Sequence, residues 1–137
     1  MTDTGFQDLM TQATTGSSRF GHREHIHLTW LAVRRYGMPA AISVVSNGIQ
    51  LTARYAGAPQ KYNATLSRAW VELVAHHTLN EDETDFDRFA AGNPALLDKR
   101  LVTRFYHPAT LATTQARTSW TPPDRAPFPW QPPPGTV

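Results

Sequence analysis

The 137-residue sequence contains no cysteine, and this absence removes several kinds of function at once. Without thiols the chain has no disulfides, no thiolate metal site and no cysteine nucleophile. A chain without cysteine suits a reducing compartment, where disulfides rarely persist. We therefore expect a cytoplasmic protein whose fold depends on its hydrophobic core.

The sequence also lacks the patterns that mark nucleic-acid-binding and membrane proteins. Its 13 Lys and Arg face 11 Asp and Glu, for a formal charge of +2, and the two signs are interspersed. Nucleic-acid binders usually concentrate basic residues in a stripe, so we expect no nucleic-acid partner. No apolar run approaches the ~20 residues of a membrane span, and residues 1–5 show no sign of a signal peptide. We therefore expect no membrane partner.

No stretch alternates apolar and polar residues in the manner of a β-strand, whereas helical spacing recurs along the chain. We predict an all-α, single-domain bundle of about five helices, since 137 residues can form one core. A flexible lead-in is expected over 1–19, with a short helix at 6–12 as the alternative, and the helical domain over 20–119. Most of the 11 prolines fall in 120–137, which predicts an extended Pro-rich tail. The aromatic residues of this tail favour its packing on the domain.

The segment 20–30 places three of the six histidines in a pattern typical of an amphipathic helix, predicted over 21–36. At about 100° per residue, His22 and His25 fall on the apolar face, whereas His27 points toward solvent. The spacing sets His22 and His25 one helical turn apart on the same side. Because polar groups are seldom buried without partners, two imidazoles on this face indicate a site.

A histidine pair one turn apart supports two kinds of chemistry. Imidazole titrates near neutral pH, so His22 and His25 could act as a general acid and a general base. The same pair could supply two ligands to a divalent metal, with His77 of a later helix as a third. A catalytic metal site needs about three protein ligands, and only two are fixed by spacing here. We therefore favour no cofactor and keep a divalent metal as the alternative.

A second cluster, at 61–65, begins a helix predicted over 62–78. Tyr62 can donate or accept a proton, and Asn63 can orient a substrate carbonyl. Free backbone N–H groups at a helix start can also hold a carboxylate or another anion. The alternative is ordinary helix capping by Asn63, with Tyr62 in the core. For a pocket between the two helices, the predicted apolar lining is Phe20, Ile26, Trp30, Leu66 and Trp70.

Three segments carry a likeness to known proteins. They are 20–26 (Phe-Gly-His-Arg-Glu-His-Ile), 61–65 (Lys-Tyr-Asn-Ala-Thr) and 101–111, which includes Tyr-His-Pro. Together they resemble a widespread, largely uncharacterised family of small bacterial all-helical proteins. That family has a Trp-Thr-His-x-x-His-Leu segment, a later Gly-Tyr-His-Glu-Thr segment and a Tyr-Tyr-Ser-Pro segment nearer the end. The resemblance covers roughly residues 20–125.

The resemblance implies an α-helical domain in which three histidines bind a metal or work as acid and base. In this chain Asn63 stands in the place of the third histidine, and Ala64 in the place of the glutamate that follows it. A neutral amide is a poor ligand for borderline metals. The resemblance therefore implies metal-free chemistry, with an amide that binds substrate beside the two remaining histidines.

We accordingly expect a small-molecule enzyme of the cyclase, lyase or isomerase type, in specialised biosynthesis, with a small-molecule substrate. In this interpretation His22 and His25 move protons, while Tyr62 and Asn63 position or polarise a carbonyl. The first alternative is a metal-dependent enzyme with His22 and His25 as ligands. The second is a non-catalytic binding module that uses the Pro-rich tail.

Overall fold

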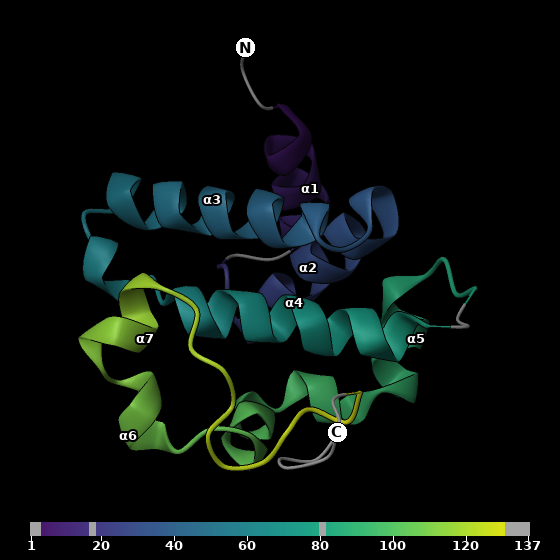
Figure 1. Ribbon diagram of the computed structural model, residues 1–137. Helices are drawn as coiled ribbons and strands as arrows, with labels where there is room; N and C mark the ends of the chain where they lie inside the picture. Colours follow the sequence, from purple (N-terminus) through teal and green to yellow (C-terminus); the bar gives the residue numbers. More distant parts are fainter. Residues whose placement is uncertain (1–3, 17–18, 80–81, 131–137) are drawn as a thin grey trace.

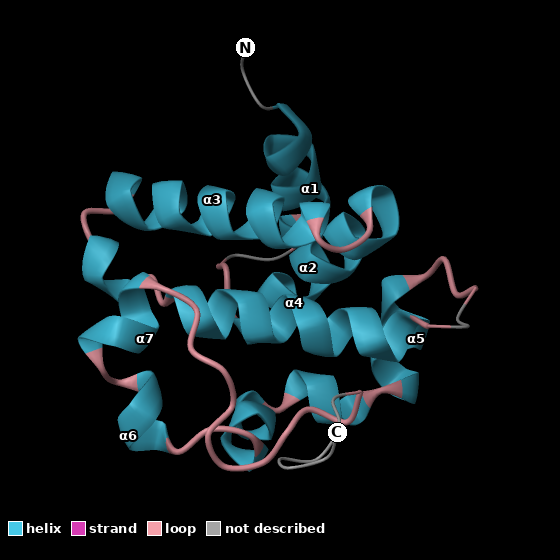
Figure 2. Cartoon of the chain, viewed as in Figure 1, coloured by secondary structure: helices cyan, strands magenta, loops and turns pink. Residues whose placement is uncertain are grey.

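The computed structural model describes residues 4–16, 19–79 and 82–130, and every regular element in these ranges is helical (Figure 1, Figure 2). The α-helices are α1 (Thr4–Thr14), α2 (His22–Tyr36), α3 (Ala40–Tyr55), α4 (Ala64–Thr78), α5 (Phe86–Gly92), α6 (Pro108–Leu111) and α7 (Thr114–Thr118). The 3-10 helices are η1 (Pro59–Lys61), η2 (Pro94–Leu97) and η3 (Lys99–Arg104). The predicted all-α class is confirmed.

Helix α2 is the central element and contacts α1, α3 and α4. It begins where the Gly21 N–H donates a hydrogen bond to Glu24 Oε1 at 2.7 Å. It ends at Gly37, whose φ of 69° is favourable for glycine. Its buried residues, which lie on several sides of the helix, are Ile26, Leu28, Thr29, Trp30 and Ala32. Because neighbours cover α2 on more than one side, it lacks the single apolar face that the sequence predicted.

The N-terminal segment differs from the flexible lead-in predicted over 1–19, because residues 4–14 form α1. Phe6 and Leu9 are only 5% and 2% exposed and pack with residues of α2 and α3. A helix of this length is marginal alone in water, so the packing of this face stabilises it. The helix is longer than the short one considered over 6–12, because Phe6, Leu9 and Ala13 form an apolar face that packs on α2 and α3.

Helix α3 lies beside α4, and the short C-terminal elements lie on the other side of α4 (Figure 1). The pair Asn47-Gly48 has low helix propensity, yet α3 is continuous from Ala40 to Tyr55. Gly48 is buried, and a Cβ atom there would lie 2.2 Å from ring carbons of Phe6. The glycine therefore allows α1 and α3 to approach closely.

Beyond α4 the chain forms short turns instead of long helices. Residues 94–104 contain the two 3-10 helices η2 and η3, although their apolar spacing resembles that of an α-helix, and residues 108–118 contain the two short helices α6 and α7. The Asp98 carboxylate accepts from the Arg100 N–H at 2.9 Å, and Thr113 Oγ1 accepts from the Ala116 N–H at 3.1 Å. Side chains that bind nearby backbone in this way compete with continued helix, which explains the interruptions.

The described part of the Pro-rich tail, 120–130, lies against these short elements. Phe128 is fully buried, and its ring centroid is 5.0 Å from that of Phe105. The Tyr106 hydroxyl donates to the Thr121 carbonyl oxygen at 2.6 Å. Aromatic burial and backbone hydrogen bonding thus hold a segment that has no regular structure of its own. The remaining part of the predicted tail, 131–137, lies outside the described residues.

Arg68 and Glu72, one turn apart on α4, form an ion pair that is partly buried. Arg68 Nε donates to Glu72 Oε2 at 2.8 Å, and Glu72 is only 8% exposed. The Arg68 guanidinium lies 4.2 Å from the ring centroid of Trp120, the first residue of the tail. The ion pair is partly covered because the tail crosses α4 at this point.

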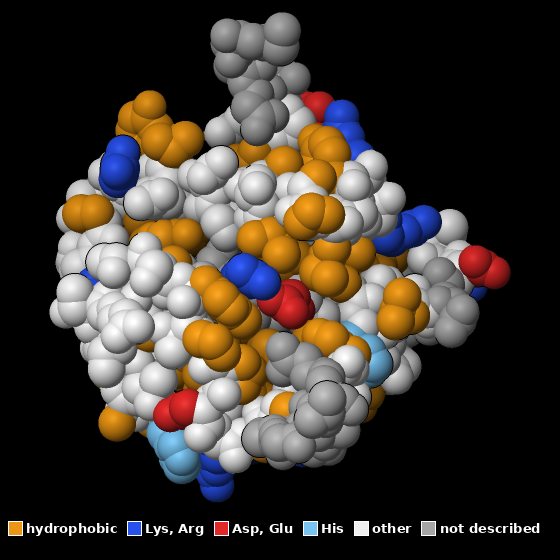
Figure 3. Space-filling view, viewed as in Figure 1, with side chains coloured by type: hydrophobic (Ala, Val, Ile, Leu, Met, Phe, Trp, Pro, Cys, Tyr) orange, Lys and Arg blue, Asp and Glu red, His pale blue; other side chains and the backbone are white. Residues whose placement is uncertain are grey.

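The charged side chains on the face shown in Figure 3 are scattered among apolar and neutral ones, and some lie as adjacent pairs of opposite sign. No helix within the described ranges is both long enough and apolar enough to cross a lipid bilayer.

Candidate functional site

His25 has a buried ring nitrogen and no hydrogen-bond partner among the residues that the structure describes. Its Nε2 is fully buried, and neither ring nitrogen makes a hydrogen bond to any residue that the structure describes. Burial lowers the pKa of His25 to about 4, and the charge of His22 adds to this effect in the same direction. Since burial penalises the charged form, this imidazole is neutral at pH 7.

His25 lines a cavity between α2, α3 and the start of α4. The cavity has a volume of about 230 Å³, and its lining residues are His25, Ile49, Lys61, Tyr62, Asn63, Leu66, Ser67 and Trp70. Five of these come from the predicted set, and they belong to segments more than thirty residues apart in the sequence. The two motifs at 22–25 and 61–65 therefore meet in one place, here called the His25 cavity.

Tyr62 and Asn63 enter the His25 cavity from the turn that precedes α4. Asn63 caps α4, because its Oδ1 accepts from the Leu66 N–H at 2.9 Å. Its Nδ2 donates to the Leu111 carbonyl oxygen, also at 2.9 Å. The amide is thus held at both ends, in the capping role that the sequence left as an alternative. The Tyr62 hydroxyl has no hydrogen-bond partner among the described residues.

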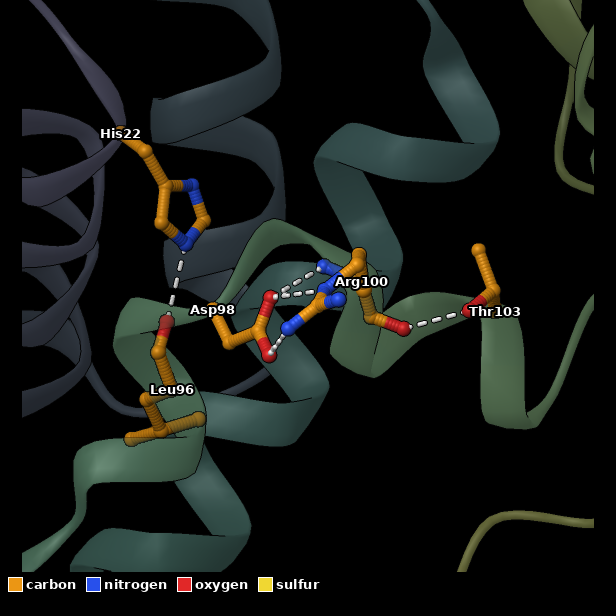
Figure 4. A network of polar contacts seen from close by, with 5 residues as sticks. All are labelled: His22, Leu96, Asp98, Arg100 and Thr103. Atoms are coloured by element: carbon orange, nitrogen blue, oxygen red, sulfur yellow. Dashed lines mark hydrogen bonds and ion pairs between the residues drawn. The ribbon is translucent and has the colours of Figure 1, made fainter.

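His22 lies outside the His25 cavity, although it is one turn away on α2. Figure 4 shows its ring pointing toward η2, where Nε2 donates to the Leu96 carbonyl oxygen at 2.9 Å. Its ring also meets the edge of Trp70, with centroids 4.7 Å apart. Burial lowers the pKa of His22. His22 therefore joins α2 to η2, and the two histidines do not stand together as an acid and base pair in the cavity.

The predicted apolar lining is only partly correct. Leu66 and Trp70 line the His25 cavity, and the Phe20 ring lies beside His25 with centroids 6.1 Å apart. Ile26 and Trp30 instead belong to the large core, where Trp30 packs 5.6 Å from Phe89. On a helix, residue 26 points about 100° away from residue 25, so the side chains of Ile26 and His25 face different neighbours.

His27 also departs from its expected solvated position. Its ring stacks on Phe86 with centroids 4.1 Å apart and an interplanar angle of 3°. Burial is the main cause that lowers the pKa of His27. The helix α5 covers this side of α2, and the sequence of α2 alone gives no indication of that contact.

His77, the predicted third metal ligand, lies elsewhere on α4. Its Nδ1 donates to Asn93 Oδ1 at 3.0 Å, and its ring contacts His76 with centroids 5.7 Å apart. Within the described ranges, no three His, Asp or Glu side chains form a group able to hold a metal ion. The proposed set His22, His25 and His77 is therefore not brought together.

Three residues of the His25 cavity were not singled out from the sequence: Ile49, Lys61 and Ser67. Ser67 Oγ lies 3.1 Å from Ser46 Oγ of α3, so these hydroxyls join α3 to α4 beside the cavity. Ile49 belongs to the apolar stripe of α3, so the packing of this stripe on α4 would have predicted its place in the cavity. Lys61 stands in the second motif itself and was overlooked because no partner for it is visible in the sequence.

No family model matches the chain, and no curated protein or solved structure matches it either. The family resemblance suggested by the histidine segments therefore stays a prediction. The fold and the site define an all-helical protein with a neutral, unpaired histidine in a mostly apolar cavity between helices.

Proposed function

We propose that the protein is a small-molecule enzyme of the isomerase, lyase or cyclase type, which moves a proton next to a carbonyl group bound in the His25 cavity. The observation that carries the proposal is the His25 imidazole, whose buried Nε2 has no hydrogen-bond partner among the described residues, in one cavity with Tyr62. Unsatisfied buried polar groups are rare in folded proteins, and perturbed titratable groups in cavities concentrate at functional sites.

The lowered pKa of His25 favours one role for this side chain over another. A general base works best when its pKa is near the operating pH, and a pKa of about 4 makes His25 a weak base at pH 7. A neutral imidazole can instead donate a hydrogen bond to a carbonyl oxygen and stabilise the negative charge that develops there. We therefore assign His25 the role of hydrogen-bond donor, in place of the proton-transfer role expected from the sequence for the pair His22 and His25.

The position of the ring determines which nitrogen carries out this role. Nε2 is fully buried, so Nδ1 is the nitrogen that a bound molecule can reach. A buried N–H group without an acceptor is rarer than a buried acceptor without a donor. The buried Nε2 is therefore the nitrogen without a proton, and the proton is on Nδ1. In this tautomer His25 presents an N–H to the substrate and leaves the Nε2 lone pair unused.

The rest of the cavity suits the same reaction. The apolar walls formed by Leu66 and Trp70 exclude water and so strengthen a hydrogen bond from His25 to a developing oxyanion. The Tyr62 oxygen takes the α-proton of the substrate as its own hydroxyl proton passes to solvent water. The negative charge left on the substrate gathers on the carbonyl oxygen that accepts from His25. Asn63 holds Tyr62 at this place by capping α4 and bonding to Leu111.

Exchange of α-protons tests this proposal without knowledge of the natural substrate. Neutral enolisable ketones, from butanone to acetophenone, are incubated in D2O with the protein, and loss of the α-proton signal is followed by ¹H NMR. The wild-type protein should accelerate exchange of at least one ketone. His25→Leu should reduce the acceleration about 100-fold, as loss of an oxyanion donor does. His25→Gln, which keeps an N–H donor, should retain part of it.

The matched control is His27→Leu, which removes a histidine of α2 that does not line the cavity. This variant should exchange the ketones at the wild-type rate. Equal rates for His25→Leu and the wild-type protein would reject the assigned role of His25. Ketones that bind in the cavity without any exchange would make the protein a binding module instead.

A further inference from the structure

A second cavity adjoins the His25 cavity across Tyr62. It has a volume of about 320 Å³, and its lining residues are Gln50, Pro59, Tyr62, Thr114, Arg117 and Thr118. Tyr62 lines both cavities, so its ring forms a wall that they share. Ligand pockets usually measure about 300–1,000 Å³. The His25 cavity alone falls below this range, and the second cavity lies at its lower end.

Each cavity contains one cationic side chain and no acidic one among its described lining residues. Arg117 is half-buried, and one Nη of its guanidinium donates to the Gln60 carbonyl oxygen. Lys61 is exposed at the His25 cavity. Neither cation pairs with a carboxylate in the part of the chain that the structure describes.

The fixed position of Arg117 distinguishes it from the flexible Lys61. Its bond to Gln60 in η1 uses one of five N–H donors and orients the remainder of the guanidinium. The planar arrangement of these donors matches the two oxygens of a carboxylate. A group bound there would be separated from His25 by the Tyr62 ring, so one extended molecule is needed to reach both side chains.

We propose that the substrate of the His25 cavity is an extended keto acid, whose carboxylate binds Arg117 in the adjoining cavity while its carbonyl-bearing part lies beside His25. This inference rests on the proposed function and adds the chemical class of the substrate. Lys61 and Arg117 provide positive charge on both sides of Tyr62, which favours entry of an anion over a neutral ketone.

Three probes that each contain the same methyl ketone group test the inference. They are 5-oxohexanoate, its methyl ester, and 4-oxopentylphosphonate, with affinities measured by titration of the ¹⁵N-labelled full-length protein in NMR. The keto acid should bind the wild-type protein at least tenfold more tightly than the ester, since hydrogen bonds to charged groups are the strong ones. Arg117→Gln should weaken binding of the acid about tenfold and leave binding of the ester unchanged.

The control variant is Arg54→Gln, which removes an exposed arginine of α3 that lines neither cavity. It should leave both affinities within about twofold, as expected for a screened surface charge. Unchanged ester binding also shows that Arg117→Gln has kept its fold. Equal effects of Arg117→Gln and Arg54→Gln would overturn the inference, because general electrostatics would then explain them.

The outcomes separate this inference from the proposed function. If the ester binds and exchanges its α-protons as well as the acid does, the anion site is rejected and the proposed enzyme stands. If the acid binds through Arg117 without exchange, the anion site is supported and the proposed reaction is rejected. Tighter binding of the phosphonate than of the acid would mean that the substrate carries a phosphate group instead of a carboxylate. Failure of all three probes to bind at millimolar concentration would overturn both proposals.

Discussion

The two hydrophobic cores of this protein are built from different kinds of residues. The N-terminal core, formed mainly by α1, α2 and α3, contains mostly small aliphatic side chains: Phe6, Leu9, Ala13, Leu28, Ala32, Ala41, Val45 and Val71. The C-terminal core gathers aromatic residues from α2, α4, α5, the turn that follows η3 and the tail, among them Trp30, Trp70, Phe89, Phe105, Tyr106 and Phe128. Regular helices can approach closely over small residues, whereas irregular chain needs large side chains to fill the space between its turns.

The polar contacts differ in the same way. In the C-terminal half, side chains bind backbone atoms far along the chain, as Tyr106 does at Thr121 and Thr65 does at Ser119, 3.0 Å away. Such bonds satisfy carbonyl groups that no helix or sheet would otherwise pair. The His25 cavity lies between α2, α3 and α4, where helices rather than turns set its shape. The cavity is therefore shaped mainly by the regular half, α1 to α4, although the Leu111 carbonyl of the C-terminal half binds Asn63. The tail stabilises the C-terminal half.

The largest expected effect is the loss of the tail from the C-terminal core. Phe128→Ala removes a fully buried ring and should lower the free energy of unfolding by about 3–5 kcal/mol. Urea denaturation followed by circular dichroism measures this change. Phe20→Ala is the matched control, because Phe20 is 39% exposed and should cost about 0.5–1 kcal/mol. Equal losses for the two variants would show that the tail is not part of the core.

The regular half is also the half that the sequence predicts best. Gly37 with Pro39, and Gly57 with Pro59, end α2 and α3 close to the expected positions, since glycine and proline act locally. The meeting of His25 with Tyr62 was predicted as well, because both motifs lie on the faces by which α2 and α4 contact.

The remaining features depend on contacts between distant parts of the chain. His22 turns toward the Leu96 carbonyl, and His27 is covered by Phe86, and neither neighbour can be known from α2 alone. The 3-10 turns η2 and η3 have apolar spacing close to that of a helix, so periodicity does not distinguish them. Their true form follows from local hydrogen bonds such as that of Asp98 to the Arg100 N–H.

The free energy of unfolding should depend on pH through His25 of the regular half. The folded pKa of about 4 is below the ordinary value of 6.5, so the unfolded chain binds more protons between these pH values. Stability should therefore be complete above pH 6.5 and fall as the pH decreases toward 4. One pKa unit corresponds to about 1.4 kcal/mol, which makes the loss on the order of 3 kcal/mol at most.

Urea midpoints measured across this range test the prediction, and His25→Leu should show a shallower dependence than the wild-type protein. The ring signal of His25 in NMR should shift near pH 4. A His25 signal that titrates above pH 6 would remove the basis for a neutral donor in the cavity.

The smallest expected effect tests how closely the helices of the N-terminal core approach. Gly48→Ala would place a methyl group against the Phe6 ring, so α1 must move, at a cost of about 1–3 kcal/mol in the free energy of unfolding. Gly92→Ala on α5 has open space around its new methyl group and should be neutral or slightly stabilising, because alanine favours helix. The double variant Phe6→Ala with Gly48→Ala should lose less than the two single changes combined. Strict additivity would mean that α1 does not press on α3 at this position, and that the N-terminal core is packed less tightly than the contact of Phe6 with Gly48 indicates.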